Sequence, residues 1–198
     1  SFFSYQKYGE KYDEVPTQIL LARYNSIIRK LEKLDYMKNG TLTEKGVFSS
    51  KIFADEITLG EIFGTTFFEQ LDEYQILLVL AAIVYEPKEM NKFKTLYKEQ
   101  KLATLKTILY KSDYFAKEKK FLELDVMTCF VHPIYEGKTF FDLIEVSSLQ
   151  EGDLIRFFGQ ILDRIGQIRK ATNNYALRRK MENCQGIVEK GLEGIYLV

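Results

Sequence analysis

The sequence is poor in the residues that build disulfides, metal sites and nucleophilic active sites. Its 198 residues include only two cysteines, Cys129 and Cys184, and a single histidine, His132. Because the two cysteines do not form a C-x-x-C pair, the sequence argues against a disulfide framework and against a structural zinc site. A lone histidine more often packs against neighbours or caps a helix than catalyses a reaction, and we expect a structural role for His132.

Long hydrophobic runs are also missing. The longest, residues 76–85 (ILLVLAAIVY), has the length of a buried helix and is too short to cross a bilayer. We therefore expect no membrane partner and no signal peptide. The scarcity of cysteine favours a reducing compartment, and we expect a cytoplasmic protein.

Excess charge of either sign is absent, since Lys and Arg number 28 and Asp and Glu number 28. Contacts to phosphates supply most of the affinity of nucleic-acid-binding domains, which are therefore usually basic. A neutral chain is not expected to bind nucleic acid tightly by itself. It can still supply a few contacts to bases within a larger machine.

Motifs of nucleotide hydrolysis and metal catalysis are missing as well. The sequence has no G-x-x-x-x-G-K-[ST], no G-x-G-x-x-G after a strand, no D-E-x-x in an ATPase setting and no H-E-x-x-H. Its carboxylates mostly stand at helical spacing from lysines, which is typical of a solvated helix surface. We expect no catalytic residue, no metal site and no cofactor of its own in this chain.

Hydrophobic periodicity predicts an all-α protein with one small β element. Apolar spacing predicts a helix over 17–34, the pair Asn39-Gly40 predicts a tight turn, and 43–53 is typical of a second short helix. Helix, hairpin and helix in this order resemble part of a winged-helix unit. We predict a linker and winged-helix-like portion over 1–57 and a helical-bundle domain over 58–198.

The bundle is predicted to contain helices over residues 59–69, 72–86, 89–114, 117–132, 138–146, 149–172 and 174–196. Two capping boxes mark helix starts: Thr58 with Glu61, and Asp72 with Gln75. Each of the three prolines is expected where a helix starts or stops.

The helix over 151–172 has an unusual pattern. Gly159 and Gly166 lie in its interior, where each costs about 0.5–1 kcal/mol relative to alanine. One stripe is apolar, with Leu154, Phe158, Ile161, Ile165 and Ile168. The opposite stripe is polar, with Arg156, Gln160, Asp163, Gln167 and Lys170. Periodicity leaves two interpretations open: a polar face in water with glycines at close-packing sites, or a face that lines a channel for a flat ligand.

Several segments resemble one known family. Residues 151–171 (EGDLIRFFGQILDRIGQIRKA) resemble the signature helix of the DSHCT domain, the C-terminal helical module of exosome-associated DExH-box RNA helicases and their HelY-like relatives. Residues 21–52 (LARYNSIIRKLEKLDYMKNGTLTEKGVFSSKI), the acidic segment that starts at 54 (ADEITLGEIF) and the closing KGLEGIYLV are similar to the family in the same order. Residues 1–6 resemble the segment that leaves the second RecA-like ATPase domain, so we expect the chain to be part of a longer polypeptide.

The resemblance implies a superfamily 2 helicase that unwinds RNA 3′ to 5′ with ATP. RecA-like domains upstream in the same polypeptide would bind ATP and Mg, be braced by the winged-helix part, and supply the hydrolase activity. The bundle would close a ring around single-stranded RNA, or DNA, and the 151–172 helix would touch its bases. The resemblance also implies a role in RNA processing, with an RNA-degradation complex as a further partner.

Carried over by position, the base contacts of the family fall on Gln160 and Asp163, where the family more often has Arg and Glu. Gln160 lacks the charge and the stacking guanidinium of an arginine. Arg156 matches an arginine one turn earlier, and it either contacts the strand or forms a salt bridge to the core. With Gln167, these residues are our candidate nucleic-acid-binding set.

Two other functions remain open from the sequence. The first is an autonomous winged-helix regulator that binds duplex DNA through 17–34, a helix that carries Arg23, Arg29, Lys30 and Lys33. Such a regulator is expected to be basic, which this chain is not. The second is a protein-interaction adaptor that uses a surface rich in Tyr and Phe.

Overall fold

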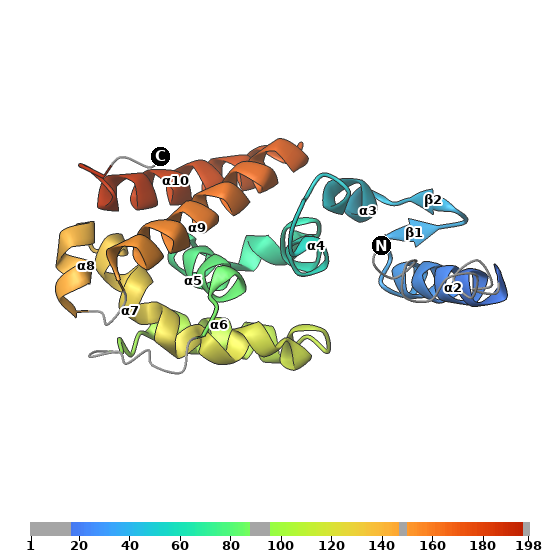
Figure 1. Ribbon diagram of the computed structural model, residues 1–198, viewed down its shortest axis with the longest axis horizontal. Helices are drawn as coiled ribbons and strands as arrows, with labels where there is room; N and C mark the ends of the chain where they lie inside the picture. Colours follow the sequence, from blue (N-terminus) through green and yellow to red (C-terminus); the bar gives the residue numbers. More distant parts are fainter. Residues whose placement is uncertain (1–16, 88–95, 147–149, 196–198) are drawn as a thin grey trace, which may run out of the picture. The chain divides into compact units, whose positions relative to one another are not determined.

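The computed structural model describes residues 17–87, 96–146 and 150–195. Contacts divide the chain into two compact units, residues 1–47 and 48–198. The described residues form nine α-helices and one two-stranded antiparallel sheet (Figure 1). This confirms the predicted all-α class with a single small hairpin. The domain boundary that we predict after residue 57 stays a prediction.

The first unit contains a helix and the hairpin. In chain order the elements are α2 (Thr17–Lys33), β1 (Met37–Lys38), β2 (Thr41–Leu42) and the start of α3 (Glu44–Ser49). The two strands pair in the register Met37↔Leu42 and Lys38↔Thr41. Asn39 and Gly40 both have positive φ, 51° and 77°, as a tight two-residue hairpin turn requires. The predicted turn is confirmed.

Gly46 allows the hairpin to pack against the start of α3. A Cβ at this position would lie 2.1 Å from the carbonyl oxygen of Tyr36, so no other residue fits without a backbone shift. The Gly46 N–H donates to Oγ1 of Thr43 at 3.1 Å, and that hydroxyl donates to the Asp35 carbonyl at 2.7 Å. These contacts fix the chain where the strands meet the helix.

The second unit is a bundle arranged around α5. Its elements are α4 (Glu56–Phe63), η2 (Thr66–Gln70), α5 (Glu73–Val84), α6 (Gln100–Tyr110), η3 (Phe115–Lys117), η4 (Lys119–Glu123), α7 (Leu124–Tyr135), α8 (Phe140–Val146), α9 (Glu151–Ala171) and α10 (Tyr175–Gly191). Every residue of α5 from Tyr74 to Val84 is buried, because α6, α7, α9 and α10 all pack against it (Figure 1). The apolar run at 76–85 is thus the central helix of the core, and α9 and α10 also pack against each other.

Of the two predicted capping boxes, one is present and one is wrong. At the start of α5, the Asp72 carboxylate accepts from the Gln75 N–H at 2.9 Å, and the Gln75 side chain accepts from the Asp72 N–H at 3.0 Å. Thr58, however, lies inside α4, which begins at Glu56 after Asp55. Its hydroxyl is within hydrogen-bond distance of Tyr114 and Glu118. The hydroxyl that the motif predicts as a helix cap therefore contacts residues that are distant in the sequence.

Several predicted helices are too long. The 59–69 helix is divided into α4 and η2, and α6 begins only at Gln100, with residues 96–99 not helical. Residues 89–95 of the predicted 89–114 helix lie outside the described residues. The 117–132 helix is replaced by η3, η4 and α7, and α7 runs past the expected end at Pro133 to Tyr135. Pro133 has no backbone N–H to donate to the carbonyl four residues earlier, so α7 continues past it with one fewer helical hydrogen bond.

In the second unit His132 is half-buried, and the two cysteines are buried. The His132 ring stacks on Tyr97 with centroids 4.2 Å apart, and its Nδ1 lies 3.7 Å from Glu99. Cys129 and Cys184 are free and buried, and burial raises the pKa of the Cys129 thiol to about 12. Neither thiol is therefore a ready nucleophile at neutral pH.

The described residues contain neither a metal-binding cluster nor a membrane-spanning helix. No three or more side chains of His, Cys, Asp and Glu form a group there that could hold a metal ion. Within the same ranges, no helix combines the length and the apolar character needed to cross a membrane.

Two glycines of α10 are expected to respond oppositely to alanine. A Cβ at Gly191 would lie 2.3 Å from the Ile134 side chain in α7, whereas a Cβ at Gly186 meets nothing within 4 Å among the described residues. We expect G191A to lower the free energy of unfolding by about 1–3 kcal/mol through overpacking. G186A should raise it by about 0.5–1 kcal/mol through helix propensity. Urea denaturation of both variants checks this, and equal effects would contradict the packing of α10 on α7.

Candidate nucleic-acid interface

Helix α9 has one buried face and one polar face, as its periodicity predicts. The five side chains of the apolar stripe, Leu154, Phe158, Ile161, Ile165 and Ile168, are each at most 1% exposed. Along the polar stripe, Arg156, Asp163 and Lys170 are exposed, while Gln160 and Gln167 are half-buried. Burial of the apolar stripe against α5 and α10 therefore fixes which side chains α9 presents outward.

The glycines of α9 are not close-packing sites within the described chain. Gly152, Gly159 and Gly166 recur every seven residues, which places them along one line of the helix. A Cβ at any of the three would have no described atom within 4 Å. Gly159 and Gly166 are therefore not required for close packing against any described residue, and the close-packing interpretation is wrong within the described chain. The three glycines instead lie on the outer face of α9, on the same side as Arg156, Asp163 and Lys170.

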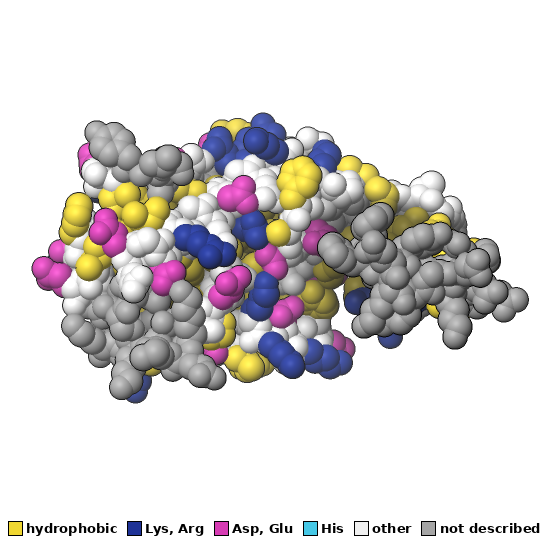
Figure 2. All heavy atoms as spheres, in the orientation of Figure 1, with side chains coloured by type: hydrophobic (Ala, Val, Ile, Leu, Met, Phe, Trp, Pro, Cys, Tyr) yellow, Lys and Arg dark blue, Asp and Glu magenta, His cyan; other side chains and the backbone are white. Residues whose placement is uncertain are grey.

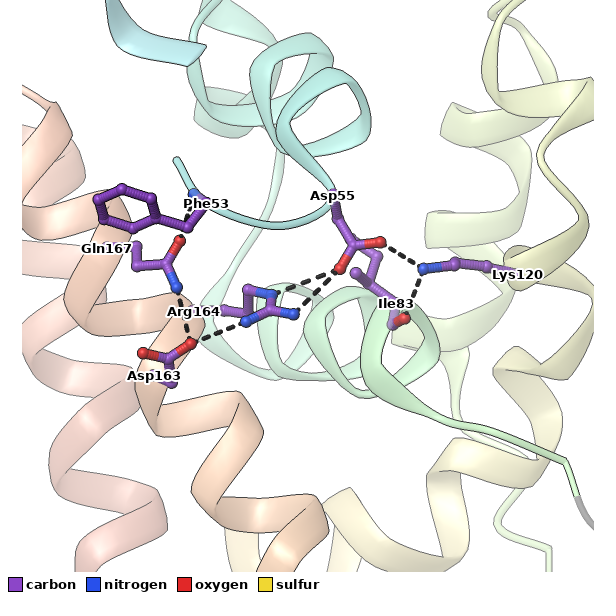
Figure 3. Close-up of polar contacts among 7 residues, drawn as sticks. All are labelled: Phe53, Asp55, Ile83, Lys120, Asp163, Arg164 and Gln167. Carbon is purple, nitrogen blue, oxygen red and sulfur yellow. Dashed lines mark hydrogen bonds and ion pairs between the residues drawn. The ribbon is translucent and has the colours of Figure 1, made fainter. Parts of the chain in front are cut away.

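Asp55 is the centre of an ion-pair network that joins the loop before α4 to α9 and η4 (Figure 3). Its carboxylate lies 2.5 Å from Nζ of Lys120 and 3.3 Å from Nη2 of Arg164. Lys120 also donates to the Ile83 carbonyl at 2.9 Å, near the end of α5. The Asp55 and Arg164 side chains are only 20% and 13% exposed, so water screens this pair weakly.

A second part of the network joins two of the predicted site residues (Figure 3). The Gln167 amide donates to Oδ2 of Asp163 at 2.7 Å, and Nη1 of Arg164 lies 2.8 Å from the same oxygen. The Gln167 oxygen accepts from the Phe53 backbone N–H at 2.9 Å. Asp163 is held in place by these donors and still has 57% of its side chain exposed.

The other two predicted site residues lie one turn or more away along α9. Gln160 is half-buried on the flank of the polar face, and Arg156 is exposed. Among the residues that the structure describes, Arg156 has no ion pair with an acidic side chain. Of the two roles that the sequence leaves open for Arg156, this supports an outward contact over a salt bridge to the core.

Three residues of this region, Arg164, its partner Asp55 and Phe53, are not among the site residues that the sequence predicts. Arg164 falls between the apolar and polar stripes, and its partner Asp55 is 109 residues away, so no local pattern reveals the pair. Phe53 was included only as the last residue of a predicted short helix. In the structure it lies beyond α3 and is 87% exposed, next to Gln167.

Charge on the visible face of the second unit is mixed. Figure 2 shows Lys and Arg side chains interspersed with Asp and Glu, without an extended patch of one sign over this face. This agrees with the zero net charge of the sequence. Any nucleic acid on this face would be held by specific polar contacts more than by a strong positive field.

Comparison with known proteins identifies the family. No match to the chain is found among curated proteins. The family model of the DSHCT (NUC185) domain matches residues 39–192, which is well over half of the chain. This range includes the hairpin turn, the Asp55 network and the whole of α9. The chain therefore belongs to the DSHCT (NUC185) domain family.

Proposed function

We propose that this chain is the C-terminal accessory module of an ATP-dependent RNA helicase and that α9 contacts single-stranded RNA during unwinding. The observation that carries the proposal is the outer face of α9, in a chain of the DSHCT family. Polar side chains there alternate with glycines that no described neighbour requires. The module is not catalytic by itself: ATP and Mg²⁺ are bound by RecA-like domains upstream in the same polypeptide.

The chemistry of this face suits bases and sugars. The Asp163 carboxylate accepts hydrogen bonds from exocyclic amines and from ribose 2′-hydroxyls, and the Gln160 amide both donates and accepts. Arg156 donates to phosphates or base edges. Where glycine replaces a side chain, a flat base or the strand backbone can approach the helix closely. Single-stranded DNA would satisfy the same contacts except those to the 2′-hydroxyl.

The exposed face of α2 supports the proposal that other domains cover this module. The five side chains Ile19, Leu20, Leu21, Tyr24 and Ile27 are 46–60% exposed. Exposed apolar side chains in this number are typical of a surface that contacts another protein surface. We assign that surface to the RecA-like domains of the same polypeptide, which the winged-helix-like portion would brace.

The same face argues against a duplex-binding regulator. A recognition helix in the major groove presents base-reading polar groups, with basic residues nearby for phosphates. The exposed basic residues of α2 lie among exposed aliphatic side chains, and the chain has no net charge. An adaptor function fits the apolar face of α2 but gives no reason for the glycines and polar groups of α9.

The size of the native polypeptide tests whether the module belongs to a helicase. We expect an antibody raised against this chain to detect, in the cells that express it, a band much larger than its 23.2 kDa. Sequencing of that band should then find ATPase motifs upstream of the module. A native band at 23.2 kDa would overturn the helicase assignment and favour the regulator or the adaptor.

A further inference from the structure

Phe53 is the most exposed of the large hydrophobic side chains that the structure describes, at 87%. Its predecessor Ile52 is only 6% exposed, so the chain turns one apolar side chain into the core and the next one out. Single exposed apolar residues are common and need no explanation in general. The surroundings of Phe53 set it apart.

The backbone on both sides of Phe53 is held firmly. Its N–H donates to Gln167 of α9 at 2.9 Å, a contact between residues 114 positions apart. The preceding Ile52 N–H donates to the Ser49 carbonyl at 3.0 Å. Two residues further on, Asp55 has a φ of 57° and pairs with both Lys120 and Arg164. The ring is thus presented from a fixed backbone, which lowers the entropic cost of binding a ligand.

Polar groups able to recognise a base edge lie beside the ring. Gln167 contacts the Phe53 backbone and the Asp163 carboxylate at once, and Asp163 is 57% exposed. In Figure 3, Phe53, Gln167 and Asp163 lie at one end of the network, and Lys120 lies at the other. An aromatic face next to an exposed hydrogen-bond acceptor is the combination with which proteins hold unpaired bases.

We infer that Phe53 stacks on a base of the single strand and that Asp163 and Gln167 face the edge of the same nucleotide. This inference rests on the proposed function and adds a binding residue from outside α9. Since every base has a π face, the contact is tolerant of sequence. The loop between α3 and α4 and the helix α9 together form a subsite for one nucleotide.

A protein partner is a less suitable occupant for this ring. Aromatic anchors of protein interfaces usually lie at the centre of a patch with few charged residues. The exposed residues around Phe53 include Lys51, Glu56 and Asp163. A ring with charged residues around it is better matched to a base, which is flat, apolar on its faces and polar on its edges.

The test uses the full-length polypeptide and a 12-nucleotide oligouridine RNA that carries one 2-aminopurine. Base stacking quenches the fluorescence of this probe. We expect F53A to weaken RNA binding about tenfold and to reduce the quenching, because stacking contacts of this kind contribute strongly to single-strand binding. F53W should retain both. F141A, which removes another exposed phenylalanine from α8, is the matched control and should leave both unchanged.

Other results would overturn the inference in distinguishable ways. If F53A binds and quenches as the wild type does while R156A or D163A weakens binding, the stacking role of Phe53 is wrong and the proposed function stands. If all three variants bind RNA normally, the proposed function fails as well. A loss of ATP hydrolysis in F53A with RNA affinity intact would assign the ring to a protein interface instead.

Discussion

Alanine in place of Arg156 or Asp163, in the full-length polypeptide, is expected to slow RNA unwinding about tenfold. A polar contact to a base edge contributes roughly 1–3 kcal/mol, which is ample for an effect of this size. RNA-stimulated ATP hydrolysis should change much less, because the proposed function assigns ATP binding to other domains. The comparison of strand-displacement rates with phosphate release, on the same protein samples, measures the two effects separately.

Two matched variants separate the strand contact from structural damage. D163N keeps an oxygen that accepts from Gln167 at the position of the present 2.7 Å hydrogen bond, but it removes the charge. R179A removes an exposed arginine from α10 and should unwind normally. If both R156A and D163A unwind at wild-type rates, α9 is not the helix that contacts the strand.

Replacement of Asp55 by alanine is expected to give the largest loss of stability, about 2–3 kcal/mol. D55A leaves Arg164, only 13% exposed, without its partner from the α4 loop, and Lys120 loses the same carboxylate. It also places alanine at a φ of 57°, a left-handed conformation that aspartate tolerates better. In a chain of this size the melting temperature should fall by about 4–12 °C. Thermal denaturation, monitored by circular dichroism, measures this change in melting temperature.

A conservative variant distinguishes the two causes of that loss. D55N tolerates positive φ as well as aspartate does and retains two hydrogen-bonding groups, but it cannot pair ionically with Lys120 and Arg164. We expect it to lose roughly half of the stability that D55A loses. If D55A melts at the same temperature as the wild type, the Asp55 network does not stabilise the fold.

Features that depend on neighbours in the sequence could be predicted well. The buried and polar faces of α9, the central helix α5 and the turn at Asn39-Gly40 follow from periodicity and backbone preference. The cap at Asp72 was correct because its partner Gln75 is only three residues away. The motifs quoted from the sequence also led to the family that the comparison finds.

Features that depend on distant partners could not be predicted in this way. The motif at Thr58 has the right local spacing, but its hydroxyl contacts Tyr114 and Glu118, more than 50 residues away. The pairing of Arg164 with Asp55 and the contact of Gln167 with Phe53 span 109 and 114 residues. A local pattern contains no information on such contacts. For this reason the sequence indicated the polar face of α9 but not the loop that completes the candidate site.

Photocrosslinking can map the path of RNA on the protein and test directly whether α9 contacts the strand. Single-stranded RNA that contains 4-thiouridine would be bound to the full-length polypeptide, irradiated and digested, and the crosslinked peptides identified by mass spectrometry. We expect crosslinks within residues 151–172 and at the segment around Phe53. Efficient crosslinking confined to other parts of the polypeptide would contradict the assignment of α9 to the strand path.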